Sequence, residues 1–157
     1  MGIQAAMDQL SGQVINIIPL QGPNQPFEAI DLNGTGPKLE DEAKIRDRVF
    51  DIGTSSFPED DGEAGHPKCG RLRARVEMVL RIGYRLVDNL DRRAVDIKVA
   101  EDVRMIANCL MNPMGWDAAN TDILSVLPPE RPTSEVIDEE AIIVSIPFIL
   151  LYRELSN

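Results

Sequence analysis

One short segment of the chain carries an imidazole and a thiol three positions apart, His66 and Cys69. Such residues serve as zinc ligands or as a nucleophile and its base. A zinc site needs two more ligands, and the only other cysteine, Cys109, lies in a predicted helix. A nucleophile pair needs an orienting partner, and none stands at a recognisable spacing. We therefore interpret this segment as a surface loop and expect neither a metal nor a cofactor.

Two other segments resemble ligand-binding loops only in part. Residues 33–38 are glycine-rich but lack the G-x-x-x-x-G-K-[ST] spacing of a phosphate-binding loop. The acidic run at 59–63 lacks the alternating ligands and the closing glutamate of a calcium loop. One histidine in 157 residues also argues against zinc hydrolases and histidine-based triads. The sequence predicts a protein that is not an enzyme.

The composition indicates an acidic globular chain. It holds 26 Asp and Glu against 16 Lys and Arg, a formal net charge of −10, and 43% hydrophobic residues. A chain of this charge does not bind DNA by neutralising phosphates, although it could line a path along which DNA slides. No apolar run reaches the roughly 20 residues of a membrane helix, so no membrane partner is expected. Two cysteines favour a reducing compartment.

The clearest pattern is an alternation between residues 72 and 86. Every even position is apolar, which predicts a β-strand with one buried face. A strand of this length measures about 50 Å, far more than the usual five or six residues. We expect it to bend, or to leave the body as an arm that pairs elsewhere, and Gly83 could mark a bulge.

The other face of this strand is basic and carries Arg71, Arg73, Arg75, Arg81 and Arg85. It could bind nucleic acid, but no aromatic side chains interleave for base stacking. It could also be an exposed face whose charges block unwanted strand pairing. In an acidic chain, contact with acidic patches on a neighbouring copy is the interpretation we favour.

Apolar spacing and Pro or Gly breaks predict the elements around this strand. In chain order they are a helix at 3–18, an irregular segment at 21–38 held by Phe27 and Ile30, a short strand at 48–52, a surface loop at 54–70, a helix at 92–112, a strand at 123–127, an acidic connection at 130–140 and a final strand at 141–153. Together they predict an α+β fold with a mostly antiparallel sheet, one long strand and two packing helices. We expect a single domain, in which 1–45 form a helix and an irregular extension and 46–157 form the core.

Two elements carry more specific expectations. Asp91 or Asp96 should cap the helix at 92–112, whose polar side shows Lys98, Glu101, Asp102, Arg104 and Asn108. The final strand is apolar on both faces, as expected of a central or interface strand. Within it, Pro147 cannot donate to a ladder and should mark an edge register or a bulge.

Three segments carry a resemblance to a known family: RLRARVEMVLRIGYRL at 71–86, AVDIKVAEDVRMIANCLMN at 94–112 and AIIVSIPFILLYRE at 141–154. In this outline, the stretch from Arg48 to Glu154 resembles the tail-terminator proteins of tailed bacteriophages, the minor tail protein U-like group. About forty residues from Gln9 to Arg48 exceed what a short terminator has. The protein could therefore be another neck protein, a head-completion stopper or an adaptor. An acidic inhibitor that mimics DNA is a further alternative.

The resemblance implies a homo-hexameric ring in the virion neck, assembled in the host cytoplasm. Such a ring caps the tail tube protein, stops tube polymerisation, meets the head connector or stopper protein, and lets DNA pass through its lumen. On this view the expected subunit and partner contacts are Arg71, Arg73, Arg75, Arg81, Ile149 and Leu151. The expected acidic residues of the lumen are Glu59, Asp60, Asp61, Glu63, Asp138, Glu139 and Glu140.

Overall fold

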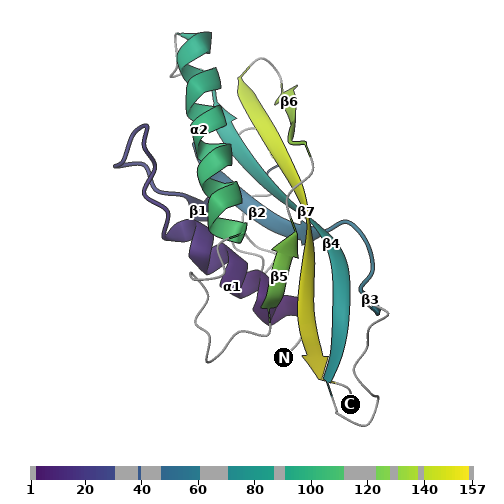
Figure 1. Ribbon diagram of the computed structural model, residues 1–157. Helices are drawn as coiled ribbons and strands as arrows, with labels where there is room; N and C mark the ends of the chain where they lie inside the picture. Colours follow the sequence, from purple (N-terminus) through teal and green to yellow (C-terminus); the bar gives the residue numbers. More distant parts are fainter. Residues whose placement is uncertain are drawn as a thin grey trace.

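Figure 1 shows the computed structural model of the protein, which describes residues 3–30, 39, 47–60, 71–86, 91–111, 123–127, 131–137 and 140–155; at 59, 60, 71–73, 124, 154 and 155 it describes the backbone alone. The elements are α1 (Ile3–Ile15), β1 (Glu28–Ala29), β2 (Val49–Thr54), β3 (Glu59–Asp60), β4 (Arg71–Arg85), α2 (Arg92–Met111), β5 (Ile123–Leu127), β6 (Thr133–Ile137) and β7 (Ala141–Leu155).

All strands of the described residues belong to one sheet of seven strands. Its main path runs β1-β2-β4-β7-β5, while β3 pairs with β4 and β6 pairs with β7. Every pairing is antiparallel except that of β1 with β2. The predicted α+β class, with a mostly antiparallel sheet and two helices, is confirmed.

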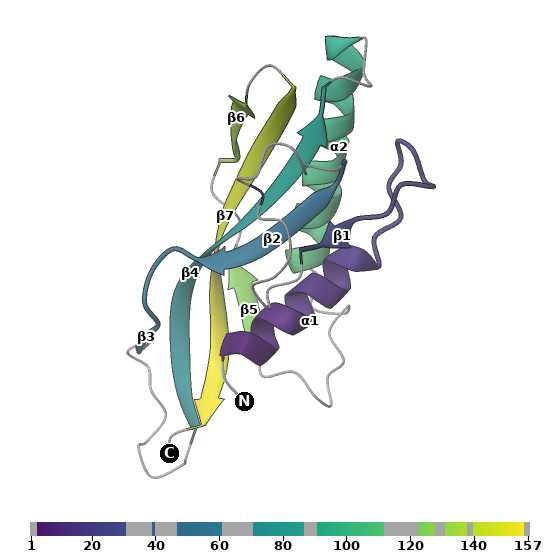
Figure 2. The same ribbon diagram turned by 180° about the vertical axis from the view of Figure 1, so that it is seen from behind.

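The long strand β4 has a partner of equal length within its own chain. Both β4 and β7 are 15 residues long, and they pair in one register from Arg71 opposite Leu155 to Arg85 opposite Ala141. The resulting ribbon curves and twists along its length (Figure 2). The strand therefore bends with its partner. The predicted bulge at Gly83 is wrong, because the pairing with β7 runs through Gly83 without a shift and the pairing with β2 ends there in register. The register shift of the sheet lies in β5, between Ile123 and Ser125.

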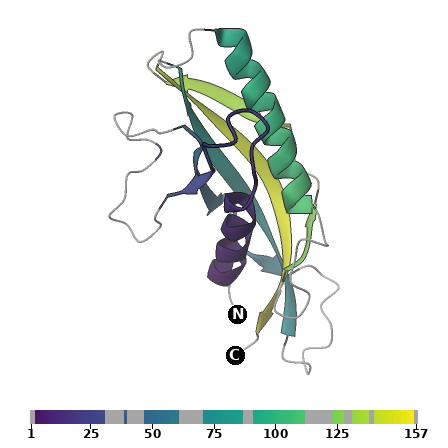
Figure 3. The same cartoon turned by 90° about the vertical axis from the view of Figure 1, so that its left-hand side faces the viewer.

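One face of the ribbon forms the core. The described even positions of β4 from 74 to 84 are buried, as the alternation predicts, and so are the even positions of β7 from 142 to 152. Both helices pack on this face, α1 through Ala6, Leu10 and Val14, and α2 through Val95, Ile106 and Leu110. Figure 3 looks onto this helical layer, with the strands behind it. Because α1 belongs to the same cluster, the N-terminal helix is part of the core.

Several predicted boundaries change. The first helix ends at Ile15, and the predicted loop at 54–70 contains β3. The predicted connection at 130–140 is wrong, because it contains β6, which takes up the β7 edge from Ala141 to Ser145. Asp91 is the cap of α2, since its Oδ1 accepts from the Arg93 N–H over 3.0 Å, whereas Asp96 pairs with Arg92.

Two predictions about irregular positions are confirmed. Phe27 is buried in the main core, and Ile30 packs on a smaller cluster around Leu39. Pro147 lies opposite Val79 of β4 in an unshifted register. On the other side of β7, the pairing with β6 ends at Ser145 and the pairing with β5 starts at Ile149. No described strand therefore borders Pro147 on that side. This is the edge register that its missing N–H requires.

Candidate subunit interface

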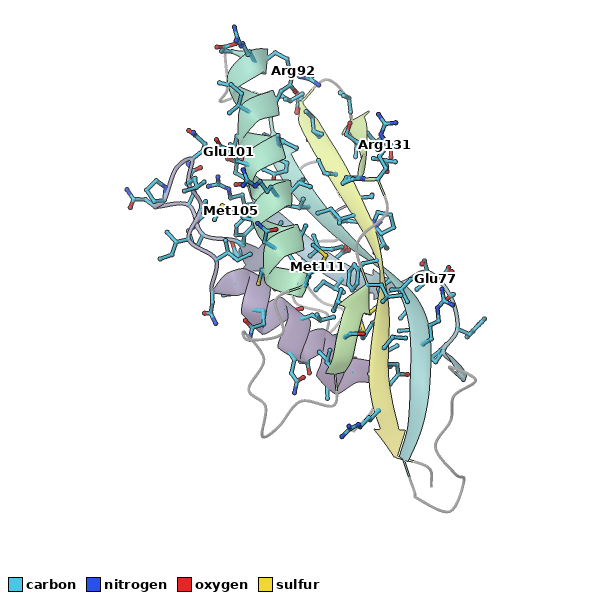
Figure 4. All side chains as sticks on the ribbon, in the orientation of Figure 1. Glu77, Arg92, Glu101, Met105, Met111 and Arg131 are labelled. Carbon is cyan, nitrogen blue, oxygen red and sulfur yellow. The ribbon has the colours of Figure 1, made fainter. Side chains whose placement is uncertain are left out.

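Neither α1 nor α2, the two helices of the described residues, covers the opposite face of the ribbon. Cross-strand pairs on it are Arg75 with Leu151, Glu77 with Ile149, and Arg81 with Ser145. In Figure 4 the labelled Glu77 lies on the far side of the sheet from Glu101 and Met105 of α2. We call this surface the open sheet face and define it by Arg75, Glu77, Val79 and Arg81 of β4, Leu127 of β5, and Pro147, Ile149 and Leu151 of β7.

The open sheet face combines half-buried apolar residues with charged residues that lie among them. Val79, Pro147, Ile149 and Leu151 are all half-buried, whereas Arg75 and Glu77 are exposed. Near the other end of the ribbon, Leu39 and Ile30 cover Ala141 and Ile143, so the open sheet face stops there. A mixed surface of this kind suits a protein contact, because it offers apolar side chains beside exposed charged ones such as Glu77, which lies opposite Ile149.

Four of the six predicted interface residues come together on this face: Arg75, Arg81, Ile149 and Leu151. Arg81 is already engaged in its own chain, because its Nη2 lies 2.8 Å from Asp51 Oδ2 on β2. Arg75 keeps an exposed side chain. For Arg71 and Arg73 the backbone alone is described, opposite Leu155 and Arg153. The interface role of all six stays a prediction.

The predicted acidic residues fall on two segments of the chain, 59–63 and 138–140. The backbone of Glu59 and Asp60 forms β3 and pairs opposite Arg75 and Ala74. Glu140 is exposed in a turn, and its carbonyl accepts from the Leu86 N–H over 2.7 Å. Asp61, Glu63, Asp138 and Glu139 lie outside the described residues. Their position along a lumen stays a prediction.

The structure contains a buried ionic cluster that the sequence analysis missed. Arg48 Nε donates to Asp102 Oδ2 over 2.7 Å, and Tyr84 Oη donates to the same oxygen over 3.0 Å. Asp102 was predicted on the polar side of its helix, and that prediction is wrong, because the side chain is fully buried. Its position does carry a signal, since it falls in the apolar stripe of Val95, Val99, Ile106 and Leu110 at helical spacing.

A second ion pair lies against this cluster. Lys98 Nζ donates to Asp47 and lies 5.9 Å from the centre of the Tyr84 ring. The Arg48 guanidinium lies 5.6 Å from the centre of the Phe27 ring. Burial, and then the Asp102 carboxylate, raise the pKa of Tyr84 far above its ordinary value. Tyr84 therefore stays protonated and donates to Asp102. The arrangement neutralises buried charge and links α2 to the start of β2.

The remaining chemistry-bearing residues form no described site. Burial raises the pKa of the Cys109 thiol, which donates to the Gln13 carbonyl over 3.5 Å. His66, Cys69 and residues 33–38 lie outside the described residues. In the described part of the chain, no group of three or more His, Cys, Asp or Glu side chains could hold a metal ion.

Comparisons of the sequence with protein-family models and with curated proteins give no match. Neither described helix has the length and apolar character needed to span a membrane.

Proposed function

We propose that this chain is a structural protein of a tailed-phage virion, a tail terminator. It forms a homo-hexameric ring at the head-proximal end of the tail tube and stops tube polymerisation there. The same ring joins the tail to the connector or stopper protein of the head. DNA passes through its lumen without sequence-specific contact. The protein is assembled in the host cytoplasm and acts in the virion neck, with no catalytic role.

The observation that carries this proposal is the open sheet face. It brings Arg75, Ile149 and Leu151 together on a ribbon about 50 Å long, and neither helix covers that face. Partly apolar surfaces of this kind mark protein contacts. A closed ring needs such a surface on every subunit, together with a different surface that fits it.

The arrangement of the family-like segments gives further support. The segment at 71–86 contains β4, the segment at 94–112 contains most of α2, and the segment at 141–154 contains most of β7. These are the long strand, the helix packed across the sheet and the closing strand of the tail-terminator outline. Here β4 and β7 pair along their whole length, and α2 packs on their buried face.

The charge of the chain supports the passage of DNA. With a net charge of −10, the subunit repels the phosphate backbone at long range. A ring of several such subunits multiplies this charge, so DNA is expected to move through it without binding.

Deletion of the gene from the phage tests the proposal directly. Without the protein, tails should grow beyond their normal length and carry no heads, because nothing stops addition of tube protein. Electron microscopy of the lysate measures both features. Tails of normal length in the deletion mutant would rule out a tail terminator.

Purification of incomplete particles separates the tail terminator from a neighbouring neck protein. A terminator should remain with tails that lack heads, whereas a stopper or adaptor should remain with heads that lack tails. Light scattering of the purified protein, alone and with tube protein, adds the size of the assembly. A hexamer supports the ring, and a chain that stays monomeric in both conditions contradicts it.

A further inference from the structure

The loop that follows α1 exposes large apolar side chains. We call residues 16–26 the clamped loop. Within it, Ile18 is 74% exposed and Leu20 is 70% exposed. No charged residue occurs from Gln9 to Phe27, although 27% of the chain is charged. An uncharged segment that presents aliphatic side chains to solvent has the composition of the centre of a protein interface.

Buried groups bind the backbone of this loop at Gln21, Gly22 and Gln25. The Arg48 guanidinium donates to the carbonyl of Gln21, and to those of Gly22 and Gln25 over 3.0 Å each. Asp102 accepts from the other side of the same guanidinium, over 2.7 and 3.0 Å. The Gln25 N–H also donates to the Gly22 carbonyl over 3.0 Å, closing a turn.

This support reaches the backbone of the clamped loop but leaves Ile18 and Leu20 uncovered. A loop already ordered in its binding conformation loses little entropy when a partner covers it. The clamped loop is therefore preorganised to bind a partner surface.

The open sheet face offers a matching surface. Val79, Pro147 and Ile149 of this face are uncharged and half-buried, and the exposed Glu77 lies beside Val79 and opposite Ile149. Beside it, the Ser55 N–H donates to the Glu77 carbonyl over 2.9 Å, and Ser56 Oγ accepts from the Glu77 N–H over 3.0 Å. The chain leaves the sheet at this point with Phe57, which is 91% exposed. Exposed aromatic side chains are the usual anchors of protein interfaces.

The two surfaces lie on opposite sides of the molecule. In Figure 1 the clamped loop projects to the left, beyond the helices, and in Figure 2, seen from behind, it projects to the right. Glu77, which marks the open sheet face, lies to the right in the orientation of Figure 1 (Figure 4). One copy therefore cannot cover its own open sheet face with its own clamped loop. Two different surfaces on opposite sides produce head-to-tail contacts, which form a ring when the rotation from one subunit to the next closes.

We propose that the clamped loop of one copy docks on the open sheet face of a second copy. Ile18 and Leu20 then contact the row of Val79, Pro147 and Ile149, with Phe57 at its edge. This inference rests on the proposed ring, and it names the contact that closes it. It also assigns a role to the residues before Arg48 that the tail-terminator outline leaves unexplained.

The double variant I18E/L20E tests the contact. Both side chains are exposed, so circular dichroism and the melting temperature should stay as in the wild type. Two carboxylates in an apolar contact should raise the apparent dissociation constant of the ring at least about 100-fold. Light scattering across concentration, with and without tube protein, measures this. The matched control is Ile97→Glu, an exposed apolar residue of α2 outside both surfaces, which should assemble as the wild type does.

Disulfide trapping tests the pairing itself. Leu20→Cys and Ile149→Cys are placed in separate copies, with Cys69 and Cys109 replaced by serine and alanine, and the two proteins are mixed and oxidised. A cross-linked dimer is expected, whereas Leu20→Cys mixed with Ile97→Cys should give none. Trapping of Leu20→Cys on tube protein instead of on a second copy would overturn the inference.

The outcomes separate the two proposals. If I18E/L20E forms rings with wild-type affinity, the proposed loop contact is wrong and the proposed ring function still stands. If the wild type forms no ring with or without tube protein, and its deletion leaves tail length normal, the proposed function and the contact fail together.

Discussion

Arg48 and Asp102 form a bidentate ion pair, with Nε 2.7 Å from Oδ2 and Nη2 3.0 Å from Oδ1, although 54 positions separate them in the chain. Both side chains are fully buried. Arg48 has a φ of 61°, in the left-handed region that a non-glycine residue rarely adopts. Its N–H donates to the Gly83 carbonyl over 2.8 Å, and its carbonyl accepts from the Glu28 N–H over 3.0 Å. This one residue therefore joins α2, three strands and the clamped loop.

Loss of the Asp102 carboxylate should be strongly destabilising. Asp102→Ala leaves the Arg48 guanidinium buried without a counter-ion, so the free energy of unfolding should fall by about 3–5 kcal/mol. Urea denaturation followed by circular dichroism measures the change. Asp96→Ala is the matched control on the same helix, since its partner Arg92 is exposed, and it should change stability by less than about 0.5 kcal/mol. Equal effects of the two variants would contradict a structural role for the buried pair.

The buried hydroxyl of Tyr84 predicts a loss of stability at alkaline pH. Burial and Asp102 raise its pKa in the folded state, whereas in the unfolded chain the pKa is about 10. Its contribution is therefore fully present below about pH 10 and is lost as the pH rises above that value. Tyr84→Phe removes the hydrogen bond to Asp102 and should cost about 1–3 kcal/mol at neutral pH.

The comparison of wild type and Tyr84→Phe across pH isolates this effect. The other titrating groups are common to both proteins, so the stability gap between them should narrow by up to about 1.4 kcal/mol per pH unit above pH 10. Denaturation curves at pH 8, 10 and 11 measure it. A gap that stays constant over this range would show that Tyr84 ionises equally in both states.

Two arginines on the open sheet face should behave differently. Arg81 pairs with Asp51 at a partly exposed site, so Arg81→Ala should lower the free energy of unfolding by at most about 1 kcal/mol. Arg75 is exposed opposite Leu151, so Arg75→Glu should leave stability unchanged and weaken assembly of the ring. Denaturation and light scattering separate the two effects. Arg75→Glu rings of wild-type affinity would remove Arg75 from the interface.

Two glycines near the N-terminus should respond to alanine in opposite directions. Gly22 has a φ of 67°, and an added Cβ would lie 3.4 Å from Gln25 Oε1. Gly22→Ala should therefore cost about 1 kcal/mol or more. Gly12 lies inside α1, and a Cβ added there would meet no described atom outside its own helix within 4 Å, so Gly12→Ala should stabilise the protein by about 0.5–1 kcal/mol. Thermal unfolding compares them, and a stabilised Gly22→Ala would contradict the shape of the clamped loop.

The regular elements could be predicted because their signals are local. The alternation from 72 to 86 and the helical stripe of α2 record which side of each element is apolar, and burial follows that side. The edge position of Pro147 follows from its missing N–H, which is also a local property. From these patterns alone the sequence determined the fold class, the buried face of β4 and the approximate extent of the two longest strands and of α2.

The tertiary structure decided what depends on distant partners. The sequence of β6, Thr133–Ile137, is mostly polar and exposed, and it is a strand because β7 offers a free edge beside Ala141–Ser145. Asp102 is buried because Arg48 arrives from 54 positions away, and a carboxylate is stable in a core only with such a partner. The open sheet face, likewise, exists only because β7 matches β4 in length and register while both helices pack on the other side.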